Sequence, residues 1–132
     1  MHVPMITANY LAILALLYTV LALQVMRLRQ GNRADFGDGD SARLRSAIRV
    51  HANFAEYVPI IALMVALLEM SGASALRVHV LMGTLLVSRL LHPLGMYAKP
   101  NTLPFCGIAI TIGLLIASAL MILTQFGFGA TN

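Results

Sequence analysis

The sequence has very few of the residues that stabilise soluble or secreted proteins. Of its 132 residues only 11% are charged and one, Cys106, is a cysteine. A single cysteine excludes an intrachain disulfide. The four histidines and this cysteine have none of the spacings typical of zinc sites, so we expect no metal site. An average soluble domain has about 25% charged residues, and the chain is therefore not expected to be a soluble globular protein.

Hydrophobic residues make up 59% of the chain and occur in long runs. The run from Met5 to Met26 has no formal charge, and at about 1.5 Å per residue it can cross about 30 Å of hydrocarbon. It has no basic segment before it, so we interpret it as a retained helix and not as a cleaved signal. The pattern predicts one all-α membrane domain over residues 1–132, a bundle of four transmembrane helices at about 5–26, 41–70, 74–97 and 102–126.

Most of the basic residues lie between the first two helices. These are Arg27, Arg29, Arg33, Arg43, Arg45 and Arg49. Such clustering could indicate a nucleic-acid surface, but in a membrane protein it marks the cytoplasmic side. We therefore expect no nucleic-acid partner, and we expect both termini on the non-cytoplasmic side. The glycine-aspartate segment "DFGDGDS" predicts a flexible, exposed loop from Arg27 to Arg45, with Asp40 or Ser41 capping the second helix.

Three polar residues interrupt the second hydrophobic run at regular helical spacing. Arg49, Asn53 and Glu56 stand at i, i+4 and i+7, with Tyr57 beside them. Together they offer a guanidinium for a carboxylate, an amide for a peptide group and a carboxylate for an ammonium, as a small zwitterionic peptide would need. The alternative is a buried salt-bridge network with Arg89 that fixes helix register, and the two interpretations are compatible.

The third run cannot face lipid on all sides, because Arg77, His79, Arg89, His92 and Pro93 interrupt it. Arg89 and His92 share one helix face at i and i+3. His92 next to a proline is either a functional group or a hydrogen-bonded spacer. Cys106 lies in an apolar context with no neighbour that would lower its pKa, and we expect it to be inert.

The segment "RVHANFAEYVP", the four short apolar runs and the arginine-rich first loop resemble the MAPEG family, the membrane-associated proteins in eicosanoid and glutathione metabolism. The resemblance covers essentially the whole chain. It implies a homotrimer of four-helix subunits in a bacterial inner membrane, binding glutathione between neighbouring subunits near the cytoplasmic surface. Membrane lipid and lipophilic small molecules are the other implied partners. The glutathione-binding positions that it implies are Arg49, His51, Asn53, Glu56, Tyr57, Arg89, His92 and Tyr97.

The chain also departs from the family pattern. Members that conjugate glutathione usually place an arginine at the start of the fourth helix, where this chain has Pro104. The catalytic residue is therefore unknown, and the candidates for thiol activation are Arg27, Arg29, Arg89 and Lys99. The helix-three tyrosines of the eicosanoid enzymes are only partly matched, with His92 at one position and Tyr97 near the other. An eicosanoid substrate is therefore unsupported.

The function expected from this resemblance is that of a glutathione transferase or peroxidase acting on lipophilic electrophiles, although the sequence leaves open whether the chain turns over substrate. A small multidrug transporter of four helices is an alternative. Such exporters resemble one another in an essential glutamate in the first helix, and Met5 to Met26 contains none. The other alternative is a trimer that binds glutathione or lipid without catalysis.

Overall fold

The computed structural model describes the backbone of residues 3–97 and 102–127, and the side chains of residues 3–93 and 107–127. Four α-helices make up this part of the chain: α1 (Met5–Asn32), α2 (Ala42–Met70), α3 (Ala75–Tyr97) and α4 (Thr102–Phe126). Each contains a segment long and apolar enough to cross a membrane. The expected four-helix, all-α membrane architecture is confirmed.

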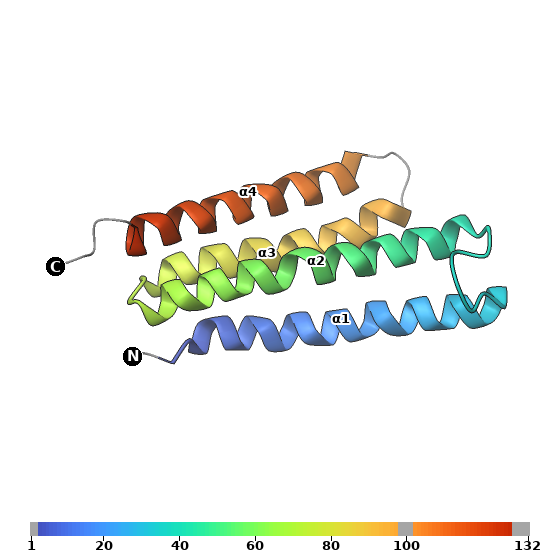
Figure 1. Cartoon of the computed structure of the whole chain (residues 1–132), viewed down its shortest axis with the longest axis horizontal. Coiled ribbons are helices and arrows are strands. Elements are labelled where there is room, and N and C mark those ends of the chain that lie inside the picture. The colour runs from blue at the N-terminus through green and yellow to red at the C-terminus, as the bar shows by residue number, and fades with distance from the viewer. Residues whose placement is uncertain (1–2, 98–101, 128–132) are drawn as a thin grey trace.

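The helices lie side by side along one direction (Figure 1). The loop between α1 and α2 lies at one end of the molecule, and the connection between α2 and α3 lies at the other. The start of α1 and the end of α4 share the end opposite the α1–α2 loop. This arrangement agrees with an even number of spans, while the assignment of the arginine-rich end to the cytoplasm stays a prediction.

The first helix is longer than the sequence indicates. We expected it to end near Met26, but α1 continues to Asn32, and Arg33 closes it in the left-handed conformation with a φ of 50°. The expectation that a loop begins at Arg27 is wrong for a physical reason. Arginine and glutamine are good helix formers, and beyond the hydrocarbon their charge no longer opposes helix extension.

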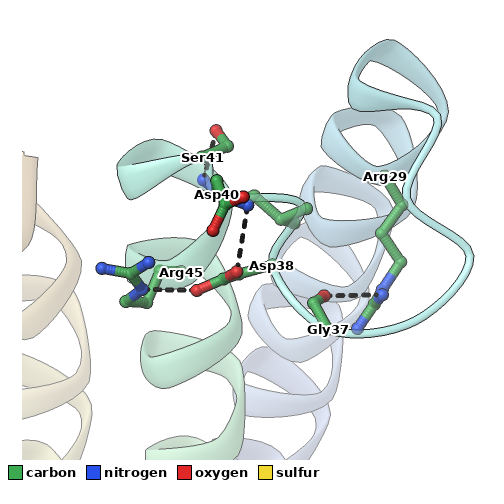
Figure 2. A network of polar contacts seen from close by, with 7 residues as sticks. Arg29, Gly37, Asp38, Asp40, Ser41 and Arg45 are labelled. Atoms are coloured by element: carbon green, nitrogen blue, oxygen red, sulfur yellow. Dashed lines mark hydrogen bonds and ion pairs between the residues drawn. The ribbon is translucent and has the colours of Figure 1, made fainter.

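Two arginines hold the short loop that remains between α1 and α2. The Arg29 guanidinium donates to the carbonyl of Gly37 at 3.0 Å, and Arg45 forms an ion pair with Asp38 (Figure 2). Gly37 has a φ of 67°, which a glycine adopts without strain. Ser41 caps α2 by accepting the N–H of Leu44 at 3.3 Å, as one of the two expected caps. The loop is exposed as expected, but these contacts give it a defined conformation.

The second helix lies at the centre of the bundle and packs against α1, α3 and α4. Its inward face buries Val50, Phe54, Val58, Ile61 and Val65 at helical spacing. Leu14 of α1 and Met82 and Leu85 of α3 belong to the same core. Because α2 touches every other helix, a polar residue on it can interact with any of them.

A carboxylate of α2 caps the start of α1. Glu69 accepts the backbone N–H groups of Ile6 and Thr7, both at 2.9 Å, and the Thr7 hydroxyl at 2.6 Å. Pro4, at the N-cap position, provides no side-chain cap of its own. Glu69 therefore satisfies N–H groups that a helix start otherwise leaves without partners. The sequence analysis missed this contact, although an acid at the end of an apolar run was a signal for it.

Candidate functional site

The three polar residues of α2 differ in burial within the single chain. Asn53 is buried, whereas Arg49 and Glu56 are exposed. At 100° per residue, the spacing from Asn53 to Glu56 rotates the side chain by about 60°. The stripe therefore straddles the border of the buried face, with Asn53 directed inward and the two charged residues outward. Helical spacing places the three residues on one side of the helix, and within the single chain this border divides that side.

Arg89 of α3 is the centre of a buried polar network. Its side chain is 2% exposed, and its Nη1 donates to the Asn53 Oδ1 at 2.6 Å. Its Nη2 donates to Thr111 of α4, and its Nε donates to the neighbouring Ser88 hydroxyl at 3.3 Å. The network thereby joins α2, α3 and α4. All of these partners are neutral oxygens.

The alternative network, in which the Glu56 carboxylate joins Arg49 and Arg89 by salt bridges, is absent from the described side chains. Ser88 and Thr111 bond to Arg89 where the alternative network had the Glu56 carboxylate, and Thr111 also donates to the Gly107 carbonyl at 2.7 Å. Both residues are fully buried. Sequence reasoning missed them because a serine or threonine in an apolar helix commonly satisfies its hydroxyl on its own backbone.

The contact with Arg89 determines the orientation of the Asn53 amide and the kind of partner that the amide can still bind. A guanidinium only donates hydrogen bonds, so the amide atom facing it must be the carbonyl oxygen. The remaining part of the amide is its NH2 group, which also only donates. Any further partner of the Asn53 side chain must therefore be an acceptor, such as a carboxylate or a peptide carbonyl.

His51 and Tyr57 lie apart from this network in different ways. The His51 ring stacks on Tyr18 of α1 with ring centroids 4.6 Å apart, and Tyr18 also contacts Phe54. Tyr57 is half-buried against the core. Next to the Tyr18 stack, an apolar groove of about 240 Å³ runs between α1 and α2, bounded in part by Leu11 and Pro59. His51 thus belongs to the contact between α1 and α2.

Of the remaining predicted residues, the structure describes the side chains of His92, Arg27 and Arg29. His92 is buried where α4 comes close, since a Cβ on Gly107 would lie 3.2 Å from that of His92. Arg27 is exposed and lines a groove with Arg43, while Arg29 holds the loop. Lys99 lies outside the described residues, as do the side chains of Tyr97, Pro104 and Cys106. Within the described ranges, no three His, Cys, Asp or Glu residues are grouped so that they could hold a metal ion.

Known proteins resemble this chain over most of its length. The sequence model of the MAPEG family matches residues 7–124. Two inner membrane proteins named YecN, from Escherichia coli strain K12 and from E. coli O6:H1 strain CFT073, are each 40% identical over 95 residues, 72% of this chain and 72% of the relative. No solved structure matches the chain.

The names of these relatives and the four apolar helices agree with the expected location, a multi-pass protein of the inner membrane. With its helix-two segment "RVHANFAEYVP" and a family match from residue 7 to residue 124, this chain belongs to the MAPEG family.

Proposed function

We propose that the chain binds glutathione on the outward face of α2 and acts as a membrane-bound glutathione transferase or peroxidase on lipophilic electrophiles. One observation carries the proposal. Arg49 and Glu56 are exposed on the single chain, and neither has a hydrogen bond or ion pair among the described residues. Charges at membrane depth need partners, and a ligand or a second copy of the chain would supply them for these two residues.

Glutathione fits the groups that this face offers. It has two carboxylates, one ammonium and two peptide groups. The Arg49 guanidinium suits a carboxylate, and the Glu56 carboxylate suits the ammonium. The Asn53 side chain is buried at the border of this face, and its NH2 group, which can only donate, suits a carboxylate or peptide carbonyl that reaches this border. Arg49 is positive, Glu56 is negative, and the Asn53 NH2 group lies between them along the helix. These three groups therefore suit a zwitterionic peptide better than a simple anion.

A homotrimer is the second part of the proposal. Beyond Glu56, the exposed side of α2 continues with Ile60, Leu63 and Leu67, which are 53%, 63% and 42% exposed. A neighbouring copy packed on this face would cover the apolar residues and close a site around Arg49 and Glu56. The site would then lie between subunits, and lipophilic substrates would reach it from the bilayer.

In the transferase reaction, the glutathione thiol loses its proton to solvent and the thiolate sulfur attacks an electrophilic carbon. A carbon–sulfur bond forms while the bond to a leaving group such as chloride breaks. In the peroxidase reaction, two glutathione molecules reduce a lipid hydroperoxide to an alcohol and water and become a disulfide. A nearby cation lowers the thiol pKa, and the candidates are Arg27, Arg29, Arg89 and Lys99. Of these, Arg89 donates a hydrogen bond to Asn53, and Arg29 donates one to the Gly37 carbonyl of the first loop.

A titration of the purified protein with glutathione, followed by thiolate absorbance at a series of pH values, tests the proposal. We expect glutathione to bind, and we expect its thiol pKa to fall only slightly below that of free glutathione, because Pro104 replaces the family's helix-four arginine. Conjugation of a chlorinated nitrobenzene should accordingly be slow. Absence of binding would contradict the proposed function. Binding without any turnover would instead favour the alternative of a non-catalytic glutathione-binding trimer.

A further inference from the structure

A second basic site lies between α1 and α2, on the side of α1 away from the apolar groove. It is an open groove of about 480 Å³ at the end of the molecule that carries the first loop. Two arginines line it, one from each helix, together with a glutamine and three apolar residues. The lining residues are Val20, Leu23, Gln24, Arg27, Leu28 and Arg43.

The two groove arginines differ from the nearby Arg29 and Arg45 in having no bonding partner among the described residues. Arg29 donates to loop carbonyls and Arg45 is paired with Asp38, as Figure 2 shows. Arg27 and Arg43 are both exposed, and no hydrogen bond or ion pair joins either of them to another described residue. The groove therefore presents two guanidinium groups to an external anion.

The rest of the groove is apolar on the side that leads into the membrane. Val20 and Leu23 are 59% and 45% exposed, and Val20 lies about 10 Å along the helix axis from Arg27, toward the middle of the span. A charged end at the membrane surface with an apolar wall below it matches a molecule that is anionic at one end and hydrocarbon at the other. A free phosphate ion would use only the charged end.

We propose that this groove binds an anionic phospholipid, with its phosphate between Arg27 and Arg43 and an acyl chain along Val20 and Leu23. Guanidinium groups bind phosphate oxygens in bidentate geometry, and basic residues just outside a membrane span attract anionic lipids. The groove is distinct from the face with Arg49 and Glu56, and lipid binding there does not require glutathione. An Arg27 that holds the lipid phosphate is then not the cation that lowers the thiol pKa, which leaves Arg29, Arg89 and Lys99 as candidates for that role.

Native mass spectrometry of the full-length protein in a neutral detergent, with added phosphatidylglycerol or phosphatidylcholine and no glutathione, tests this site. We expect phosphatidylglycerol to be retained in preference to phosphatidylcholine. The double variant Arg27→Gln, Arg43→Gln should weaken retention of phosphatidylglycerol by about tenfold or more. Both positions are exposed, so the variant is expected to fold, which circular dichroism checks.

The control is Arg33→Asn, matched in charge to each of the single variants Arg27→Gln and Arg43→Gln. It removes one exposed, unpaired arginine from the same end of the molecule, outside the groove, and asparagine tolerates the φ of 50° at this position. It should leave lipid retention nearly unchanged. An equal loss in this control would overturn the proposal in favour of diffuse attraction by the basic loop. Displacement of the lipid by inorganic phosphate at comparable concentration would overturn it in favour of a simple anion site.

Discussion

The buried Arg89 is the residue on which the interior of the bundle depends. Arg89 is 2% exposed, and the described side chains that bond its guanidinium do so through neutral oxygens, those of Asn53, Ser88 and Thr111. A buried charge is tolerated when its hydrogen bonds are satisfied. The same bonds orient the Asn53 amide, and in this way they connect a structural role in the core to the proposed binding face.

Asn53→Asp separates these two roles. The new carboxylate can pair with Arg89 and keep the network, so the midpoint of thermal unfolding should be equal to or above that of the wild type. It has no NH2 group to donate, however, and it adds a negative charge beside the glutathione carboxylates. We expect glutathione affinity to fall by about tenfold or more, measured by calorimetric titration. Unchanged affinity would show that the Asn53 amide does not contact glutathione.

At the scale of the elements, α1 depends on contacts that lie far away in sequence. Glu69 caps its first turn, and Arg29 near its end holds the loop that leads into α2. The interior of α1 is among the most apolar segments of the chain and buries little of its surface within one subunit. Its position against α2 is therefore determined largely at its ends.

Glu69→Ala should loosen the start of α1. The substitution removes the acceptor of two backbone N–H groups and of the Thr7 hydroxyl, and the loss of a helix cap costs about 1 kcal/mol or more. We expect a lower midpoint of thermal unfolding by far-ultraviolet circular dichroism. Asp35→Ala, which removes an exposed carboxylate, is the control and should change little. Equal midpoints for the two variants would exclude a stabilising role for the Glu69 cap.

The Asp38–Arg45 pair makes the loop conformation depend on pH. The hydrogen bond from Arg45, followed by that from the Asp40 N–H, lowers the pKa of the Asp38 carboxyl below its ordinary value of 3.8. Because the folded pKa is depressed, the pair stabilises the loop above the ordinary pKa, and this contribution is lost as pH falls through the folded pKa. An NMR titration of Asp38 should show the lowered midpoint, and Arg45→Gln should raise it. A midpoint insensitive to this substitution would argue against the pair in solution.

The number and order of helices follow from hydrophobic run length and breaker residues, which is why the bounds of α2, α3 and α4 closely match the prediction. The end of α1 does not follow from hydropathy, because polar residues such as Arg27 and Gln30 extend a helix as readily as they form a loop. The inward turn of Asn53 and the contribution of Thr111 depend on how α3 and α4 pack against α2. The sequence of one helix does not show how the other helices pack against it.

At the scale of the whole molecule, the single chain exposes one face that is both charged and apolar. The exposed side of α2 carries opposite charges at Arg49 and Glu56 followed by an apolar stretch, although α2 also packs against all three other helices. A homotrimer with glutathione between its subunits would satisfy the charges and cover the apolar residues. The two proposals for this face therefore support each other, while the Arg27–Arg43 groove lies outside it.

The most direct test of this account is the glutathione affinity of Arg49→Ala compared with that of Arg77→Ala, measured by calorimetric titration of the purified proteins. Both variants remove one exposed arginine and the same net charge, but Arg77 lies at the start of α3, at the opposite end of the molecule from the first loop. We predict that Arg49→Ala weakens binding by more than about tenfold, or about 1.4 kcal/mol, because a charge-assisted bond in a partly desolvated site is lost. Arg77→Ala should bind like the wild type. Equal affinities for the two variants would contradict a glutathione site on the outward face of α2.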